Sequence, residues 1–267
     1  MIRLDGKTVD FAETGSGPSV LFLPGSYSTP AAWRPLQKLL PPGYRMAATS
    51  LCGYGATEET RSLADASMDH EVRIVAHVAR QLDGPVHLVG HSFGATVALA
   101  AALDDALDVA SMTLFEANPL ALLKDGGSEA LYREALKMSL DFETAVAAGE
   151  PDAAGRIIDF WGGEGSFAAM PDAVQDYCRK TAPSNVLDWR TDFGFAAGVA
   201  DYARLSAPVL LVRGARANPA MVEMTRRLQD SLMDARVEVV PDAGHFLVSS
   251  HPGQCARLLA SSLTAAA

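Results

Sequence analysis

The hydrophobic positions in the first half of the chain form short strand-like runs that alternate with longer helical stretches. The runs SVLFLP and VHLVG are almost continuously apolar and are bounded by Gly or Pro, which is typical of strands buried on both faces of a parallel sheet. The pattern predicts strands at Ile2–Leu4, Lys7–Glu13, Val20–Leu23, Tyr44–Ala48 and Val86–Val89, and helices at Ala31–Leu40, at Ser67–Leu82 and from Ser92 onward.

The pattern changes after the run VASMTLFE, which ends at Glu116. From Asn118 to about Asp201 there are only helical stretches broken by Gly and Pro, and strand-like runs resume at APVLLVRG and ARVEVVPDAG. Alternating strands and helices predict an α/β fold, with a mostly parallel twisted sheet covered by helices on both faces. We therefore expect a core domain of residues 1–117 and 202–267 and a helical cap inserted at residues 118–201.

Composition narrows the possible partners. The net charge is −10 and no basic run of five residues occurs, which argues against nucleic acid and anionic membranes. The start of the chain has no apolar stretch typical of a secretory signal, and no apolar run has the roughly 18 residues of a membrane helix. The spacing of Cys52, Cys178 and Cys255 fits neither a disulfide framework nor a zinc site. We expect a cytoplasmic protein that needs no metal or other cofactor.

One short motif carries candidate chemistry. Gly90-His91-Ser92-Phe93-Gly94 falls where an apolar run passes into an alanine-rich stretch, so a serine is placed at a sharp turn between a strand and a helix. Glycine on both sides permits the close backbone approach that such a turn requires, and the helix N-terminus favours developing negative charge. The alternative is a tight structural turn without chemistry. The strand and helix on either side favour a nucleophile at Ser92.

Together with GHSFG, the segments FLPGSYSTPAAW, LCGYGAT and PDAGHF resemble the α/β-hydrolase family over essentially the whole chain. The resemblance implies the branch with a serine nucleophile and a helical cap. It also implies that His245, between the last strand and the last helix, is the general base. The backbone amides of Phe93 and Ser26 would then form the oxyanion hole. Pro24 departs from the family pattern, which usually has histidine before that glycine.

The acid of the triad is the main departure. The family most often carries an aspartate after the strand PVLLVRG, but the loop Gly214–Pro219 has no carboxylate, and Ala217 or Asn218 stands at the expected position. Glu223 comes several residues later, in a predicted helix, and is discounted.

A second position for the acid exists. In some branches of the family, haloalkane dehalogenases among them, a glutamate ends the strand after the nucleophile helix, and Glu116 stands there. A carboxylate that ends a buried strand needs a partner, and His245 would supply one. The alternative is a hinge residue at the entry to the insertion. Dehalogenases use an aspartate nucleophile to form an ester, whereas serine would form an unreactive ether, so Ser92 fits acyl chemistry.

The cap is expected to cover the site, with Tyr27, Trp161 and Phe167 as candidate pocket residues. The first functional hypothesis is a serine hydrolase that cleaves a small, moderately apolar ester or thioester. The second keeps the site but changes the reaction to carbon–carbon bond hydrolysis, lactone hydrolysis or cofactor-free lyase chemistry. The third is a ligand-binding protein without catalysis, since fold does not determine function.

Overall fold

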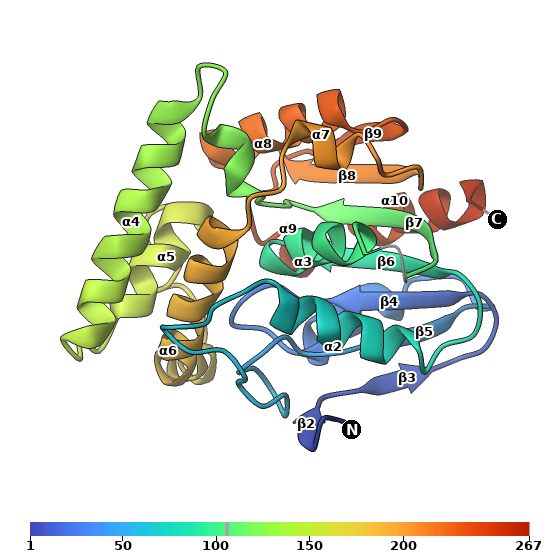
Figure 1. Ribbon diagram of the computed structural model, residues 1–267, viewed down its shortest axis with the longest axis horizontal. Helices are drawn as coiled ribbons and strands as arrows, with labels where there is room; N and C mark the ends of the chain where they lie inside the picture. Colours follow the sequence, from blue (N-terminus) through green and yellow to red (C-terminus); the bar gives the residue numbers. More distant parts are fainter. Residues whose placement is uncertain (105–106, 267) are drawn as a thin grey trace.

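The computed structural model describes residues 1–104 and 107–266 (Figure 1); residues 105, 106 and 267 of the predicted core domain lie outside the described residues. Within these ranges, seven strands form one sheet in the order β3-β5-β4-β6-β7-β8-β9, and β1 and β2 form a separate hairpin. The strand β3 is antiparallel to β5, and the other neighbours in the sheet are parallel. The predicted α/β class with a mostly parallel sheet is confirmed.

The strands are β1 Ile2–Leu4, β2 Lys7–Val9, β3 Ala12–Thr14, β4 Ser19–Leu23, β5 Arg45–Ala48, β6 Val86–His91, β7 Val109–Phe115, β8 Val209–Gly214 and β9 Ala235–Val240. The α-helices are α1 Arg34–Gln37, α2 Asp69–Ala79, α3 Phe93–Ala102, α4 Glu129–Ala147, α5 Ala153–Gly162, α6 Asp172–Gly194, α7 Val199–Tyr202, α8 Pro219–Ser231, α9 Leu247–Ser250 and α10 Pro252–Ala265. Two short 3₁₀ helices are η1 Pro30–Trp33 and η2 Leu120–Leu123.

The sheet divides the core into two layers because successive strand side chains point to opposite faces. On β4, Leu21 and Leu23 belong to the cluster that packs on α2, α3 and α8. Val20 and Phe22 belong to the opposite cluster, with η1, α1, α9 and α10. Both faces of the sheet are therefore covered by helices, as the apolar runs predict.

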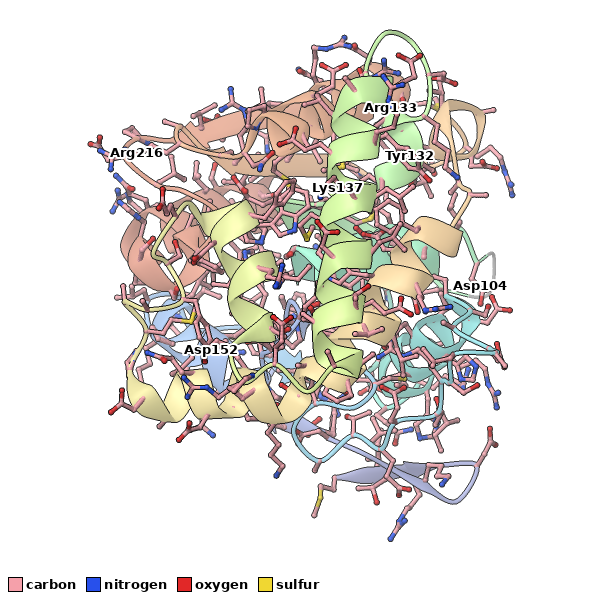
Figure 2. The ribbon with its side chains drawn as sticks, turned by 90° about the vertical axis from the view of Figure 1, so that its left-hand side faces the viewer. Asp104, Tyr132, Arg133, Lys137, Asp152 and Arg216 are labelled. Atoms are coloured by element: carbon pink, nitrogen blue, oxygen red, sulfur yellow. The ribbon has the colours of Figure 1, made fainter. Side chains whose placement is uncertain are left out.

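The segment between β7 and β8 is helical, from η2 through α7. Figure 1 shows α4, α5 and α6 beside the carboxyl ends of the parallel strands. In Figure 2, α4 crosses the face turned to the viewer, with the exposed residues Arg133 and Lys137 on its outer side. Phe142, Trp161 and Trp189 lie in an apolar cluster that these helices form with η2 and α8. Among the described residues, no helix combines the length and apolarity that crossing a membrane requires.

Two predicted elements differ from the structure. The run Lys7–Glu13 is two strands, because the chain changes pairing partners at Asp10: β2 pairs with β1, and β3 pairs with β5. The segment Ala31–Leu40 is the 3₁₀ helix η1 followed by the single turn α1. Helix ends early there, because Pro41 disfavours helical backbone at the residue before it.

We expect Gly94→Ala to destabilise the protein, because a Cβ at this position would lie 2.3 Å from the carbonyl oxygen of Pro24 and 2.5 Å from that of Leu23. Neighbouring backbone cannot yield as a flexible side chain does, so the loss in the free energy of unfolding should reach about 1–3 kcal/mol or more. Urea unfolding measures it. The control is Gly194→Ala, where a Cβ meets nothing within 4 Å. Equal stability of the two variants would contradict the prediction.

Candidate active site

Ser92 lies at the turn between β6 and α3, in a backbone conformation that side chains rarely adopt. Its φ is 53° and its ψ is −127°, a strain of the kind that clusters at functional sites. The turn is so tight that a Cβ at Gly90 would lie 2.5 Å from the Cα of Ala95. The amide of Ser92 donates to the carbonyl of Phe115 at 2.9 Å, which fixes the turn against the end of β7.

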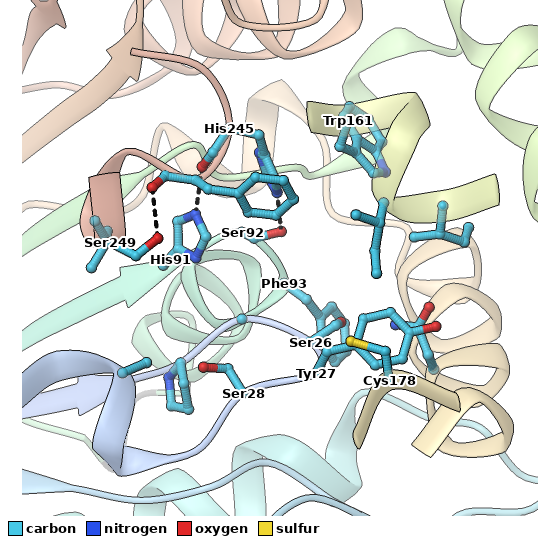
Figure 3. A pocket seen from close by; sticks show the side chains of 18 of the residues that line it. Ser26, Tyr27, Ser28, His91, Ser92, Phe93, Trp161, Cys178, His245 and Ser249 are labelled. Carbon is cyan, nitrogen blue, oxygen red and sulfur yellow. Dashed lines mark hydrogen bonds between the residues drawn. The ribbon is translucent and has the colours of Figure 1, made fainter. Parts of the chain in front are cut away.

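His245 lies in the loop between β9 and α9, within hydrogen-bond distance of Ser92 (Figure 3). Its Nε2 is 3.0 Å from the Ser92 Oγ, and its Nδ1 is 3.0 Å from the Oε2 of Glu116. A carboxylate can only accept, so Nδ1–H donates to Glu116, and Nε2 is left to accept the serine proton. The structure thus brings together the three residues predicted from the sequence as a triad.

Glu116 is buried and follows β7 directly, with a positive φ of 51°. Its second oxygen, Oε1, accepts the backbone N–H of Gly214, at the end of β8, at 2.7 Å. Both oxygens are therefore occupied, one by the neighbouring strand and one by His245. The carboxylate is oriented from two sides, as an acid that holds an imidazole must be.

The loop after β8 supplies no competing acid. Asn218 instead caps α8, its side chain accepting from the amide of Ala220 at 2.9 Å. Glu223 lies on α8 and pairs with Arg226 and Arg227. This arrangement agrees with the sequence-based prediction that Glu223 is not the acid, because its carboxylate pairs with Arg226 and Arg227.

His91 is adjacent to the nucleophile but is turned to a different partner. Its Nε2 donates to the carbonyl oxygen of His245 at 2.8 Å, which ties the His245 loop to the end of β6 (Figure 3). Burial, together with the neighbouring His245, lowers the pKa of His91 to about 3. His91 is therefore a neutral hydrogen-bond donor at physiological pH.

The two predicted oxyanion donors come from segments next to the nucleophile. Phe93 is the first residue of α3, so its N–H is among those that no helical carbonyl can satisfy. The loop of Ser26 passes close to the serine, because a Cβ at Gly25 would lie 3.1 Å from the Ser92 Cβ. The hydroxyl of Ser26 is directed elsewhere and donates to Asp188 Oδ2 at 2.6 Å. Any contribution of Ser26 to an oxyanion is thus left to its amide.

A buried charge network lies behind the loop after β4 that carries Ser26, called the oxyanion loop below. The network was not predicted from the sequence. Arg61 is fully buried and pairs with Glu71 at 3.0 Å, with Asp188 at 2.9 Å and with Glu59 at 2.9 Å. The Asp188 carboxylate also accepts the Tyr54 hydroxyl at 2.6 Å. Because Asp188 is on α6, the network joins the inserted helices to the loops after β4 and β5. The only sequence signal is the polar segment of α6 around Asp188, whose partners are distant in the chain.

A cavity of about 660 Å³ opens beside Ser92 and His245. Its walls are mostly apolar and come from both the sheet edge and the inserted helices. Of the predicted pocket residues, Tyr27 and Trp161 line the cavity. Phe167 does not: its ring packs against Gly155 of α5 and under the guanidinium of Arg179, 5.5 Å from the ring centre. No group of three or more metal-ligating side chains occurs within the described part of the chain.

Comparisons with known proteins agree with this geometry. Residues 20–258 match the model of the alpha/beta hydrolase family, so the chain belongs to that family. It is 29% identical over 263 residues to Lipase LipV of Mycobacterium tuberculosis, covering 93% of this chain and 94% of the relative. It is 26% identical over 255 residues to a 2-(acetamidomethylene)succinate hydrolase of Mesorhizobium japonicum, covering 92% of this chain and 87% of the relative.

Among solved structures, a thermophilic esterase from Thermogutta terrifontis has a TM-score of 0.77 at 20% identity, covering 97% of this chain and 94% of the esterase. The serine hydrolase CarC, involved in carbazole degradation, has a TM-score of 0.70 at 18% identity, covering 97% and 96%. The structural likeness shows the fold, and the family shows the broad activity: the protein is a hydrolase.

The buried network implies that the stability of the protein depends on pH. Burial, opposed by the neighbouring Arg61, raises the pKa of Glu71 from 4.5 to about 7. The folded protein therefore keeps a proton that the unfolded chain loses above pH 4.5. The stability that this group contributes is full below pH 4.5 and is lost as the pH rises through 7.

We expect Glu71→Gln, which cannot ionise, to lose less stability than the wild type between about pH 5 and pH 8. Urea unfolding midpoints at several pH values measure the difference. The control is Glu134→Gln on the exposed side of α4, whose curve should run parallel to that of the wild type. A Glu71→Gln curve that also runs parallel would mean that Glu71 does not titrate in this window.

Proposed function

We propose that the protein is a serine hydrolase that cleaves a small ester or thioester through an acyl-enzyme on Ser92. The observation that carries the proposal is the continuous hydrogen-bonded chain from Ser92 Oγ through His245 to Glu116, with each link at 3.0 Å. Serine is a weak nucleophile until a neighbouring base accepts its proton. In this proposal His245 is that base, and Glu116 is the carboxylate that orients it.

In the proposed acylation step, Ser92 Oγ attacks the carbonyl carbon while its proton passes to His245 Nε2. Glu116 stabilises the imidazolium that forms. The amides of Phe93 and Ser26 bind the oxyanion, and donors held in place in this way stabilise the charge that develops in the transition state. His245 then returns the proton to the leaving alkoxide or thiolate. Water, activated by His245 in the same way, releases the acid and restores Ser92.

Two observations bear on the choice of reaction. The nucleophile is a serine, which fits acyl transfer better than the alkyl-ester chemistry of dehalogenases. The relatives include a lipase that spans almost the whole chain. The second candidate is hydrolysis of a carbon–carbon bond, which would use the same nucleophile and base. Its support is general: the relatives include a hydrolase other than a lipase, the 2-(acetamidomethylene)succinate hydrolase. Hydrolysis of a lactone, or a cofactor-free lyase reaction, would likewise use this site.

The test uses a fluorophosphonate, which reacts only with an activated serine, and 4-nitrophenyl butyrate as a simple ester. The wild type should be labelled at Ser92, as mapped by mass spectrometry, and His245→Ala should not be labelled. Glu116→Gln removes the carboxylate that sets the imidazole tautomer, so kcat for the ester should fall about 10²–10⁴-fold.

Glu223→Gln is the matched control, because it neutralises the other carboxylate near the usual acid position without touching His245. Its labelling and kcat should equal those of the wild type. Labelling of Glu116→Gln at the wild-type rate would remove Glu116 from the mechanism. A folded wild-type protein that is not labelled would overturn the proposed function as a whole.

A further inference from the structure

Apart from His91 and His245 beside the nucleophile, the described lining of the cavity contains no basic side chain. Its described lining includes no Lys or Arg, whereas two carboxyl groups, Asp188 and Asp192, are part of its wall. The rest of the wall is mostly apolar, with Ile157, Ile158 and Met170 among its members. A carboxylate that leaves water for such a site has no opposite charge to pair with, and the cost of burying it is large.

The nearest buried cation cannot serve a ligand. Arg61 lies behind Asp188 and is shared among three carboxylates: those of Glu59, Glu71 and Asp188. The histidine next to the nucleophile does not supply a charge either, since the low pKa of His91 keeps it neutral. Apart from His245, the cavity wall therefore offers a negatively charged substrate no cation to pair with.

The same wall carries polar atoms that lack partners. Among the described residues, the indole N–H of Trp161, the hydroxyl of Tyr27 and the Oδ1 of Asp192 are buried and have no hydrogen-bond partner. All three residues line the cavity. Buried groups of this kind are nearly always paired, and an exception calls for an explanation.

Trp161 is the best placed of these. It is 5% exposed, its ring centre is 5.9 Å from that of His245, and Figure 3 shows its ring near His245 at the wall of the cavity. Its indole N–H can only donate, so it would pair with an acceptor on the ligand. Burial and the nearby Asp188 raise the pKa of Asp192 well above its usual value, which favours a neutral carboxyl group there as well.

We propose that this pocket selects uncharged acyl groups that carry a hydrogen-bond acceptor, such as a second ester or amide carbonyl, beyond the scissile carbonyl, and that it rejects carboxylates. The inference rests on the proposed function, which it makes more specific. It sets this protein apart from its relative named as a hydrolase of a succinate, a dicarboxylate. Trp161 and Tyr27 are the donors that would recognise the acceptor.

Three 4-nitrophenyl esters test the selectivity: methyl succinyl and hexanoyl, which have equal chain length, and hydrogen succinyl, which is shorter by one methyl group. The first has a neutral acceptor, the second has none, and the third has a carboxylate. Ser92→Ala measures the background hydrolysis of each ester. We expect kcat/KM for the methyl succinyl ester to exceed that for the hydrogen succinyl ester by at least about 100-fold, because the carboxylate would be buried without a partner. It should exceed that for the hexanoyl ester by about fivefold, the value of one hydrogen bond.

Two conservative variants test the donors. Trp161→Phe and Tyr27→Phe each remove the polar atom and keep an aromatic ring. At least one of them should abolish the preference for the methyl succinyl over the hexanoyl ester, measured as the ratio of the two kcat/KM values on the same variant. Tyr202→Phe is the matched control. Its hydroxyl is also buried and unpartnered within the described structure, but Tyr202 lies in the core, outside the cavity lining.

The outcomes separate the two proposals. If the wild type hydrolyses the hydrogen succinyl ester within threefold of the methyl succinyl ester, the inference is wrong and the proposed function stands. The same holds if neither aromatic variant changes the preference, or if Tyr202→Phe changes it equally. If no ester is hydrolysed and the fluorophosphonate does not label Ser92, the proposed function fails and the inference falls with it.

Discussion

The close contact between Gly94 and the end of β4 determines how the site is assembled. The carbonyl oxygens of Leu23 and Pro24 lie where a Cβ of residue 94 would be. The first turn of α3 can therefore pack directly against the loop that follows β4. Ser92, Phe93 and Ser26 come from two segments distant in the sequence, and this contact holds them in one small region. Any side chain at residue 94 would push the two segments apart, and with them the nucleophile and the two predicted oxyanion donors.

The order of the strands in the sheet explains where Glu116, the proposed acid, lies. In the sheet, β7 stands between β6, which leads into Ser92, and β8, where the family most often places the acid. A glutamate at the end of β7 therefore lies beside the turn of Ser92, and the loop after β9 brings His245 within 3.0 Å of its carboxylate. Its positive φ turns the side chain back toward the site, and the N–H of Gly214 occupies its second oxygen. The strand β8 thus still contributes to the proposed triad, but through a backbone donor rather than a carboxylate.

Much of the core and the three proposed site residues could be predicted from the sequence, Ser92 and Glu116 with the help of local signals and His245 from the family resemblance. Apolar runs marked the buried strands, and the paired glycines marked the turn at Ser92. A charge at the end of an apolar strand marked Glu116, since a buried carboxylate requires a partner. The network of Arg61, Glu71 and Asp188 left no such signal. Its members are distant in the chain and meet only because α6 packs against the loop after β5, which the pattern of one segment cannot reveal.

The pocket residues show the same limit. Trp161 and Phe167 are both aromatic and flank one glycine-rich segment, so the sequence did not distinguish them. In the structure, the ring of Trp161 faces the cavity, whereas the ring of Phe167 packs on α5. The difference depends on how the helices pack, and helical periodicity does not determine which of two neighbouring apolar faces meets a cavity.

The buried network also couples the two parts of the molecule in a way that bears on selectivity. Asp188 accepts the hydroxyl of Ser26, whose amide is a predicted oxyanion donor, and it lies one helical turn from Asp192 in the cavity wall. Helix α6, which places Asp188 and Asp192 in the cavity wall, therefore also holds the loop of Ser26. A cation added near Asp188 to attract carboxylated substrates would compete with Arg61 for that carboxylate, and the oxyanion loop would loosen. A variant that accepts charged substrates would therefore be expected to lose rate, because the Asp188 carboxylate both lies in the cavity wall and holds the loop of Ser26.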